Sequence, residues 1–388
     1  MDKKIKQSIN EAVEEFRVVL TEQYERNAAM KKNSEPEDGE EDRFEFVEIG
    51  LVPGDGIGPV IMDETRAVLN ALLKEEIEEG RIKFSEIEGF TIEERLACGE
   101  TVPAAVLEQL LNCDVILKGP TTTPNAASGG KNLESANVYL RKKLDLFANV
   151  RPIKLPAEKI DWTFFRENTE GEYALGSRGV KIGDELSVDF KVTTKEGTNR
   201  IARAAFEYAR ANGKSRVSIV TKANIMKKTD GEFQRLCLEM AKEYPEIETD
   251  CWFIDIMAAN LVNKAIRNQF EVFILPNLYG DIITDEAAQI QGGVGTAGSA
   301  NIGENYAIFE AVHGSAPRMV EDGLAHLANP SSLLTAAALM LRHIGLVEKA
   351  ARLDKAIKLA NDKLGAKMTG LPGGISCKAY SSMVRNNL

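Results

Sequence analysis

Histidine and paired cysteine are scarce in this sequence. Its 388 residues contain only three histidines, His313, His326 and His343, so a histidine-rich metal site is excluded. The five cysteines include no CxxC pair, which favours reduced and mostly buried thiols over disulfides or a zinc site. Any metal chemistry must therefore use oxygen ligands.

Long apolar runs and an excess of positive charge are also lacking. No run reaches the roughly 18 residues that a membrane-spanning helix needs. The first residues, Met1-Asp2-Lys3-Lys4, lead into an acidic stretch unlike a signal or transit peptide, so we expect a cytoplasmic protein. The net charge of −11 argues against a nucleic-acid partner, and we expect no membrane partner. Local arginine clusters remain compatible with an anionic ligand.

The composition is that of a soluble globular protein, with 44% apolar and 28% charged residues. The length suggests two domains. Residues 1–31 carry an apolar stripe at helical spacing, which predicts a helix packed on its own domain or on a partner subunit. Residues 32–43 contain six acids with Pro36 and Gly39, which predicts a flexible linker.

After the linker, predicted strands and helices alternate, which indicates an α/β architecture. Predicted strands cover 46–53, 114–118, 217–221 and 272–276. Predicted helices cover 59–73, 197–212, 229–244, 331–344 and 346–364.

A glycine-rich segment, Gly54-Asp55-Gly56-Ile57-Gly58-Pro59, follows the first predicted strand. Its spacing is G-x-G-x-G, not the G-x-G-x-x-G of a Rossmann dinucleotide site, and the acidic residue expected after a second strand is missing. Pro59 also removes a backbone N–H that a phosphate would need. We therefore predict a tight strand-to-helix turn.

Three acids in otherwise apolar segments are candidate metal ligands. Asp281 and Asp285 are four residues apart, so they face the same way if a helix begins at Asp281. Such carboxylates repel each other unless a cation lies between them. With Asp255 they suggest a divalent-cation site. The alternative is that Asp281 caps the helix and Asp285 lies at the surface.

Cationic residues form a second candidate group. Arg141, Arg151 and Arg166 lie near apolar strands, where guanidinium groups can hold carboxylates in bidentate fashion. The alternative is that they form surface salt bridges. Lys222 follows the buried strand 217–221 and is either a tuned acid or base or a satisfied charge at the strand end.

Together these segments resemble the isocitrate/isopropylmalate dehydrogenase family. The resemblance runs from about Phe46 to Gly374, and several motifs occur in the family's order. They are Gly54–Pro59, Lys118-Gly119-Pro120, Arg166–Gly171, Asn277–Asp281 and Ala311–Pro317.

The resemblance implies an α/β fold with two domains and a cleft between them, distinct from the Rossmann fold. Residues 1–45 would form an N-terminal helix and acidic linker. Residues 46–146 and 292–388 would form a large cofactor domain, and residues 147–291 a small domain for dimerisation and for binding metal and substrate. A homodimer whose active sites share residues is also implied.

The same resemblance implies individual roles. Asp281 and Asp285 would bind Mg²⁺ or Mn²⁺ together with Asp255 of a second copy. Tyr173, and Lys222 of that copy, would transfer protons, while Arg141, Arg151 and Arg166 would hold substrate carboxylates. The residues expected along the cofactor are Lys118, Thr122, Thr123, His313, Gly314, Ser315, Ala316, Pro317, Arg318, Met319 and Asn329.

The implied reaction, a tricarboxylic acid cycle step, converts isocitrate to 2-oxoglutarate and CO2 with reduction of NAD or NADP. Ser135 and Asn137 offer polar groups for a third carboxylate, which favours isocitrate over 3-isopropylmalate. Ser135 can alternatively be a plain helix cap. Homoisocitrate remains an alternative because one methylene discriminates by only about 1–3 kcal/mol. A non-catalytic regulatory subunit is a further alternative, although the catalytic set is present.

The residues after His313-Gly314-Ser315-Ala316-Pro317 bear on cofactor choice. NAD-using members place an aspartate there, which accepts from ribose hydroxyls. This chain has Arg318 and Met319, and arginine pairs with phosphate but cannot accept a hydrogen bond. The sequence therefore favours NADP, with Glu321 and Asp322 as alternative ribose acceptors.

Overall fold

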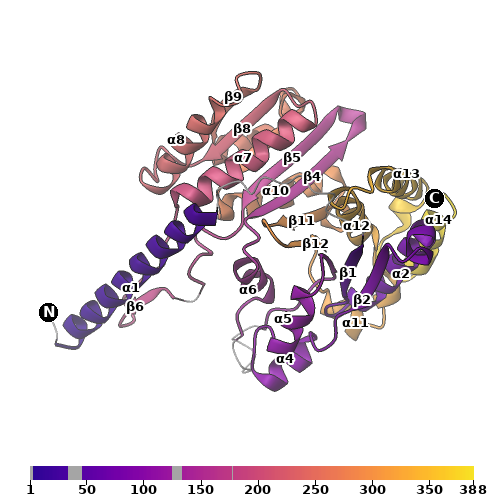
Figure 1. Ribbon diagram of the computed structural model, residues 1–388, viewed down its shortest axis with the longest axis horizontal. Coiled ribbons are helices and arrows are strands. Elements are labelled where there is room, and N and C mark those ends of the chain that lie inside the picture. Colours follow the sequence, from indigo (N-terminus) through magenta and orange to yellow (C-terminus); the bar gives the residue numbers. More distant parts are fainter. Residues whose placement is uncertain (1–2, 34–45, 125–132, 177) are drawn as a thin grey trace. The chain divides into compact units, whose positions relative to one another are not determined.

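The computed structural model describes residues 3–33, 46–124, 133–176 and 178–388. The chain divides into two compact units (Figure 1). Unit 1 contains residues 1–39 and 155–284, and unit 2 contains residues 40–154 and 285–388. Most of the predicted linker, from residue 34 on, lies outside the described residues.

The strands of unit 1 are parallel and lie in the order β5–β10–β8–β9. Helices α7, α8 and α9 contact these strands, and aromatic side chains fill the core, where the rings of Phe164 and Phe273 stack at 4.3 Å. A separate antiparallel pair, β6–β7, precedes α7. The bounds are β5 Ile160–Glu167, β6 Val180–Ile182, β7 Leu186–Val188, α7 Lys195–Ala211, β8 Arg216–Thr221, α8 Thr229–Ala241, β9 Glu248–Phe253, α9 Ile254–Val262, β10 Val272–Leu275 and α10 Asn277–Gln291, which continues into unit 2.

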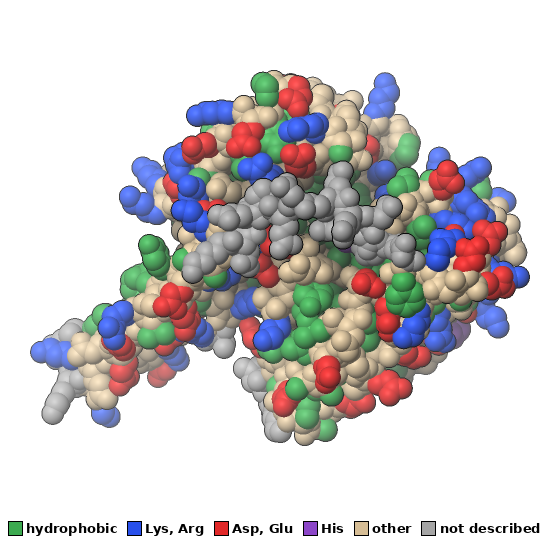
Figure 2. Space-filling model, in the orientation of Figure 1, with side chains coloured by type: hydrophobic (Ala, Val, Ile, Leu, Met, Phe, Trp, Pro, Cys, Tyr) green, Lys and Arg blue, Asp and Glu red, His purple; other side chains and the backbone are tan. Residues whose placement is uncertain are grey.

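Helix α1, Lys3–Asn33, belongs to unit 1, in agreement with a helix that packs on its own domain. It contacts α7 and β6. Val19 is buried, and the ring of Phe16 stacks on Phe190 with centroids 5.2 Å apart. Acidic, basic and hydrophobic side chains lie side by side on the exposed surface of this helix (Figure 2).

Unit 2 has six strands in the order β2–β1–β3–β12–β11–β4. The first four are parallel, and β11 is antiparallel to both neighbours. Helix α12 packs on β11 and β12, and α13, α14 and α2 extend this core. The bounds are β1 Val47–Val52, α2 Gly58–Leu72, α3 Lys74–Glu78, β2 Ile82–Glu86, α4 Ile92–Cys98, α5 Ala104–Leu111, β3 Val115–Lys118, α6 Ala136–Lys143, β4 Ala148–Leu155, β11 Gly298–Ile302, β12 Ala307–Ala311, α11 Pro317–Glu321, α12 Ser331–His343, α13 Val347–Leu364 and α14 Cys377–Arg385.

Every helix and strand predicted from periodicity is present, with ends shifted by at most a few residues. One start is wrong. Helix α10 begins at Asn277 rather than at Asp281, so Asp281 lies inside the helix and does not cap it.

All five cysteines are free, and Cys113, Cys237 and Cys377 are buried, as predicted. None of the helices in the described part of the chain is both long and apolar enough to cross a membrane.

Candidate active site

Three candidate residues of unit 1 lie at or just after the ends of parallel strands, and a fourth, Asp281, lies on the helix that follows β10. Arg166 is near the end of β5, and Lys222 directly follows β8. Asp255 is the second residue of α9, immediately after β9, and α10 begins two residues after β10. The carboxyl ends of parallel strands share one edge of a sheet, which is where α/β proteins bind their ligands.

Asp281 accepts hydrogen bonds from both Arg166 and Tyr173. Arg166 Nη1 lies 2.5 Å from Oδ1, and the Tyr173 hydroxyl lies 2.7 Å from Oδ2. The Arg166 guanidinium carbon is also 5.4 Å from the centroid of the Tyr173 ring. A substrate-binding candidate, a proton-transfer candidate and a metal-ligand candidate therefore meet at one carboxylate.

Asn277 fixes the other side of the Arg166 guanidinium. Its Oδ1 accepts from Nε at 3.0 Å and from Nη2 at 2.6 Å, and its Nδ2 donates to the carbonyl oxygen of Glu170 at 3.0 Å. Because the Arg166 side chain is only 1% exposed, its orientation is set by these contacts.

Lys222 and Asp255 form a second pair in unit 1, with Nζ 2.6 Å from Oδ1. The hydrogen bond from Lys222 lowers the pKa of Asp255. The backbone N–H of Lys222 donates to the buried carboxylate of Asp230 at 2.7 Å. The lysine is thus a paired charge at a strand end in this single chain, with 26% of its side chain exposed.

Arg151 in β4 and Asp285 in α10 form an ion pair in unit 2, 3.1 Å between Nη1 and Oδ1. The arginine is 8% exposed and the aspartate 60%. Arg141 and Arg166 are 12% and 1% exposed, so all three arginines form salt bridges with largely buried guanidinium groups.

Glu310 in β12 is a buried carboxylate shared by two candidate residues. Lys118 Nζ lies 3.3 Å from Oε2, and Arg141 Nη2 lies 3.1 Å from Oε1. Asn301 also donates to Oε1, at 2.8 Å. Burial alone would raise the pKa of Glu310, but Lys118, Arg141 and Asn301 lower it to about 2. The carboxylate is therefore ionised and holds both cations in place.

Ser135 and Asn137 lie at the start of α6. Ser135 is the residue before the helix, but its side chain makes no capping hydrogen bond, which leaves the plain-cap interpretation unsupported. Asn137 Oδ1 accepts from the Thr121 hydroxyl at 2.9 Å. Asn137 also lines a small pocket together with Lys118, Arg141 and Glu310.

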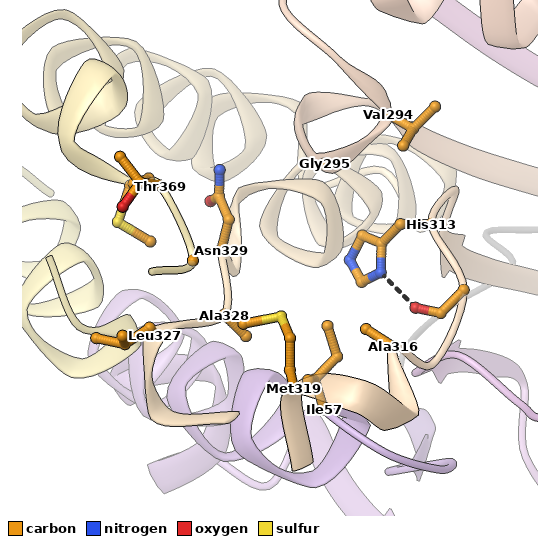
Figure 3. Close-up of a pocket in the computed structure, with 13 residues that line it drawn as sticks. Ile57, Val294, Gly295, His313, Ala316, Met319, Leu327, Ala328, Asn329 and Thr369 are labelled. Atoms are coloured by element: carbon orange, nitrogen blue, oxygen red, sulfur yellow. Dashed lines mark hydrogen bonds between the residues drawn. The ribbon is translucent and has the colours of Figure 1, made fainter. Parts of the chain in front are cut away.

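A larger cavity of about 450 Å³ lies in unit 2 (Figure 3). Burial lowers the pKa of His313, so its ring is neutral near neutral pH. Its Nδ1 lies 3.0 Å from the carbonyl oxygen of Gly314, and its Nε2 is buried without a partner among the described residues. Five predicted cofactor residues line this cavity: His313, Gly314, Ala316, Met319 and Asn329.

The other predicted cofactor residues do not line that cavity in the described structure. The hydroxyls of Thr122 and Ser315 bond to each other at 2.7 Å, which joins the two predicted segments. Lys118 belongs to the Glu310 cluster. Three residues are exposed: Thr123, Pro317 and Arg318.

The glycine-rich segment forms the predicted tight turn between β1 and α2. Gly54 has φ 75°, and a Cβ there would lie 2.2 Å from the carbonyl oxygen of Pro120. Next to it, the buried Asp55 carboxylate accepts from Thr122 N at 2.6 Å, Ile92 N at 2.7 Å and Arg95 Nη2 at 3.0 Å. The segment therefore fixes the neighbouring loops in two ways. The Asp55 carboxylate binds them, and Gly54, which has no side chain, lets the Pro120 carbonyl oxygen come close.

The residues fit a divalent cation in part. Asp281 and Asp285 are one turn apart on α10, with 37% and 60% of their side chains exposed, and both offer the oxygen ligands that Mg²⁺ and Mn²⁺ prefer. Among the described residues of one chain, however, no three acidic, histidine or cysteine side chains come close enough together to hold a metal ion.

The sequence interpretation missed the residues that hold the candidate groups. Glu310, Asn277 and Asp230 are each buried and each contact a predicted site residue. For Glu310 and Asn277 the signal was a single polar residue within or just after an apolar strand, whereas Asp230, the second residue of α8, had no such signal. Such a signal indicates that a polar side chain is buried, but it does not identify the residue that this side chain contacts.

Comparison with known proteins assigns the fold. A family model described as isocitrate/isopropylmalate dehydrogenase matches residues 48–381. The crystal structure of isocitrate dehydrogenase from Methylococcus capsulatus is 33% identical, with a TM-score of 0.77 over 88% of this chain and 99% of that one. The predicted α/β fold of this family is confirmed.

Named relatives include both cofactor types. The NADP isocitrate dehydrogenase of Rickettsia bellii is 42% identical over 326 residues, 81% of this chain, which spans only 63% of that protein. The mitochondrial alpha chain of the NAD isocitrate dehydrogenase of Homo sapiens is 39% identical over 87% of this chain and 89% of its own length. A mitochondrial regulatory subunit of the NAD enzyme of Dictyostelium discoideum is 38% identical over 86% of this chain and 89% of its own. The chain therefore belongs to the isocitrate/isopropylmalate dehydrogenase family.

Proposed function

We propose that this protein is an active dehydrogenase that oxidises isocitrate to 2-oxoglutarate and CO2 while reducing NAD or NADP. The observation that carries the proposal is the convergence of Arg166 and Tyr173 on Asp281. Arg166 can bind a carboxylate, Tyr173 can deliver a proton, and Asp281 can hold a cation.

Each arginine candidate is held by a carboxylate before substrate binds. Arg166 contacts Asp281, Arg151 contacts Asp285 and Arg141 contacts Glu310. Buried guanidinium groups fixed in this way need little rearrangement to accept substrate carboxylates.

The acidic residues and Tyr173 would serve different steps of the reaction. A divalent cation held by Asp281 and Asp285 would polarise the C2 hydroxyl and stabilise the negative charge that follows CO2 loss. A bound nicotinamide cofactor would accept the C2 hydride, and Lys222 of a second copy would accept the hydroxyl proton before CO2 leaves with cleavage of a carbon–carbon bond. The Tyr173 hydroxyl, oriented by Asp281, delivers a proton to the carbon that carried the lost carboxylate.

We include a homodimer with shared sites in this proposal. Within one chain Lys222 donates to Asp255, and Tyr173 donates to Asp281, so the two pairs share no hydrogen bond in these contacts. In a site completed by a second copy, Lys222 would restore the proton of Tyr173 and Asp255 would join the metal ligands.

The cofactor would occupy the cavity beside His313. Its largely apolar lining suits a planar ring system, and the unpartnered Nε2 of His313 offers a hydrogen bond to a ligand. We favour NADP over NAD because Arg318 follows the His313–Pro317 segment.

The test is cofactor reduction by the purified protein alone, with Mg²⁺ or Mn²⁺ and either cofactor. We expect a higher kcat/KM for isocitrate than for 3-isopropylmalate or homoisocitrate, and a large loss of kcat in Tyr173→Phe. A higher kcat/KM for 3-isopropylmalate or homoisocitrate would overturn the substrate assignment.

A regulatory role is the second candidate, favoured by the Dictyostelium relative. A regulatory subunit would bind isocitrate or cofactor but reduce none without a catalytic subunit. Failure of the purified chain to reduce either cofactor, with binding retained, would select this alternative.

A further inference from the structure

Helix α1 lies outside the part of the chain that the family model matches, which begins at residue 48. It is nevertheless docked on unit 1. Arg178, between β5 and β6, donates from Nε to Glu15 at 2.9 Å and from Nη1 to Glu22 at 2.5 Å. With buried Val19 and the stacked Phe16, these contacts hold the helix against the unit that carries Arg166 and Tyr173.

Arg26, in the last turns of α1, enters the loop between these two residues. Its Nη1 lies 2.9 Å from Glu170 Oε1, and its Nη2 lies 2.8 Å from the Thr169 hydroxyl. The side chains of Arg26 and Glu170 are 27% and 3% exposed, so this is a largely buried charge-assisted contact. The N-terminal helix therefore provides a cation to the loop.

Glu170 needs that cation because it lies beside another buried carboxylate. Burial and the charge of Glu170 raise the pKa of Glu167 to about 7. Glu170 also accepts from Thr194 N at 2.9 Å, before α7, and a Cβ at Gly197 would lie 2.3 Å from its Oε1. The position of Glu170 is thus closely confined by α1 and α7.

A short chain of contacts leads from Glu170 to the candidate active site. The Glu170 carbonyl oxygen accepts from Asn277, which in turn accepts from the Arg166 guanidinium. Arg166 donates to Asp281. Displacement of the loop at Glu170 would therefore move Asn277 and, through it, Arg166.

We propose that Arg26 is a positioning residue, through which α1 holds the segment from Arg166 to Tyr173 in its substrate-binding arrangement. The proposal rests on the function proposed above. It assigns to the N-terminal helix a role in catalysis without contact with substrate.

The test compares Arg26→Ala and Arg26→Lys with Arg17→Ala. Arg17 is an exposed residue of the same helix that pairs with Glu14, so it is a matched control. We expect Arg26→Ala to raise KM for isocitrate about tenfold, within the range of coupling through such networks. KM for the cofactor should stay unchanged, because the cofactor cavity lies in unit 2. Arg26→Lys, which keeps the charge, should restore most of the affinity.

A purely structural role would lower the amount of active enzyme and leave KM for isocitrate unchanged, and this result would overturn the proposal. Hydrogen exchange of peptides covering residues 166–173 provides a second measurement that needs no activity. Faster exchange in Arg26→Ala than in Arg17→Ala is expected, and equal exchange would contradict the positioning role. If the wild type reduces no cofactor with isocitrate, the proposed function fails, while the exchange experiment still decides whether Arg26 fixes the loop.

Discussion

Arg166 and Asp281 face each other from β5 and α10, with Nη1 of the arginine 2.5 Å from Oδ1 of the aspartate. The aspartate also accepts from Tyr173, so it is the common partner of two candidate groups. Asp281 is therefore the residue whose charge should matter most, both for the orientation of its neighbours and for holding a cation.

We predict that Asp281→Asn lowers kcat/KM by about a hundredfold or more, because it removes a metal-ligand charge and leaves the buried Arg166 without its anion. The loss should persist at saturating Mn²⁺, and calorimetry should show weaker metal binding. Glu232→Gln, which removes an exposed carboxylate paired with Arg235, is the control and should be near wild type. Full wild-type activity after dialysis against EDTA would contradict the metal assignment.

Asp55 provides a test of stability that is independent of catalysis. Its buried carboxylate compensates Arg95, whose side chain is fully buried, and accepts two backbone N–H groups. We predict that Asp55→Asn lowers the free energy of unfolding of the protein by about 3–5 kcal/mol, because a buried guanidinium loses its counter-charge. Urea denaturation measures the change. Asp63→Asn, at an exposed ion pair, should change it by less than about 0.5 kcal/mol.

Much of the fold could be predicted from the sequence because its signals are local. Helix α7 has buried residues at helical spacing, β10 is a continuous apolar strand, and β8 is almost entirely buried. These patterns arise from the spacing of apolar residues within a single helix or strand. They can therefore be recognised without knowing which element packs against it. The family motifs then indicated which known fold these helices and strands form.

The partners of the site residues could not be predicted in this way. Glu310 meets Lys118 across 192 positions of sequence, and Asn277 meets Arg166 across 111. A lone glutamate in an apolar strand is compatible with several roles until the neighbouring strand is known. The same holds for Arg26, whose place in a predicted amphipathic helix gave no indication of Glu170.

Glu167 predicts a pH dependence of stability. Its pKa is raised to about 7 by burial and by Glu170, so between about pH 4.5 and about pH 7 the folded protein holds a proton that the unfolded chain has released. The free energy of unfolding should therefore fall as pH rises through this window. Arg26, Arg200 and Thr169 surround the pair.

Glu167→Gln should remove this contribution, because glutamine does not titrate. Urea denaturation across the same pH window should show a smaller decrease in the variant than in the wild type. Glu246→Gln, at an exposed carboxylate, should reproduce the wild-type slope. Parallel curves for Glu167→Gln and wild type would show that another group carries the pH dependence.

Cofactor choice gives the last prediction. Arg318 is exposed on α11, and its neighbour Met319 lines the cavity that contains His313 and Asn329. At this position the guanidinium would pair with the 2′-phosphate of NADP but offer no acceptor to the ribose hydroxyls of NAD. We predict that Arg318→Asp lowers kcat/KM for NADP by about tenfold to a hundredfold, the effect of losing a charge-assisted contact, while NAD activity is kept or improved. Arg352→Asp, an equal charge change on the exposed face of α13, should leave the ratio of the two kcat/KM values unchanged. An unaltered ratio in Arg318→Asp would exclude Arg318 as the selecting residue and direct mutagenesis to Glu321 and Asp322, which are also exposed at the end of α11.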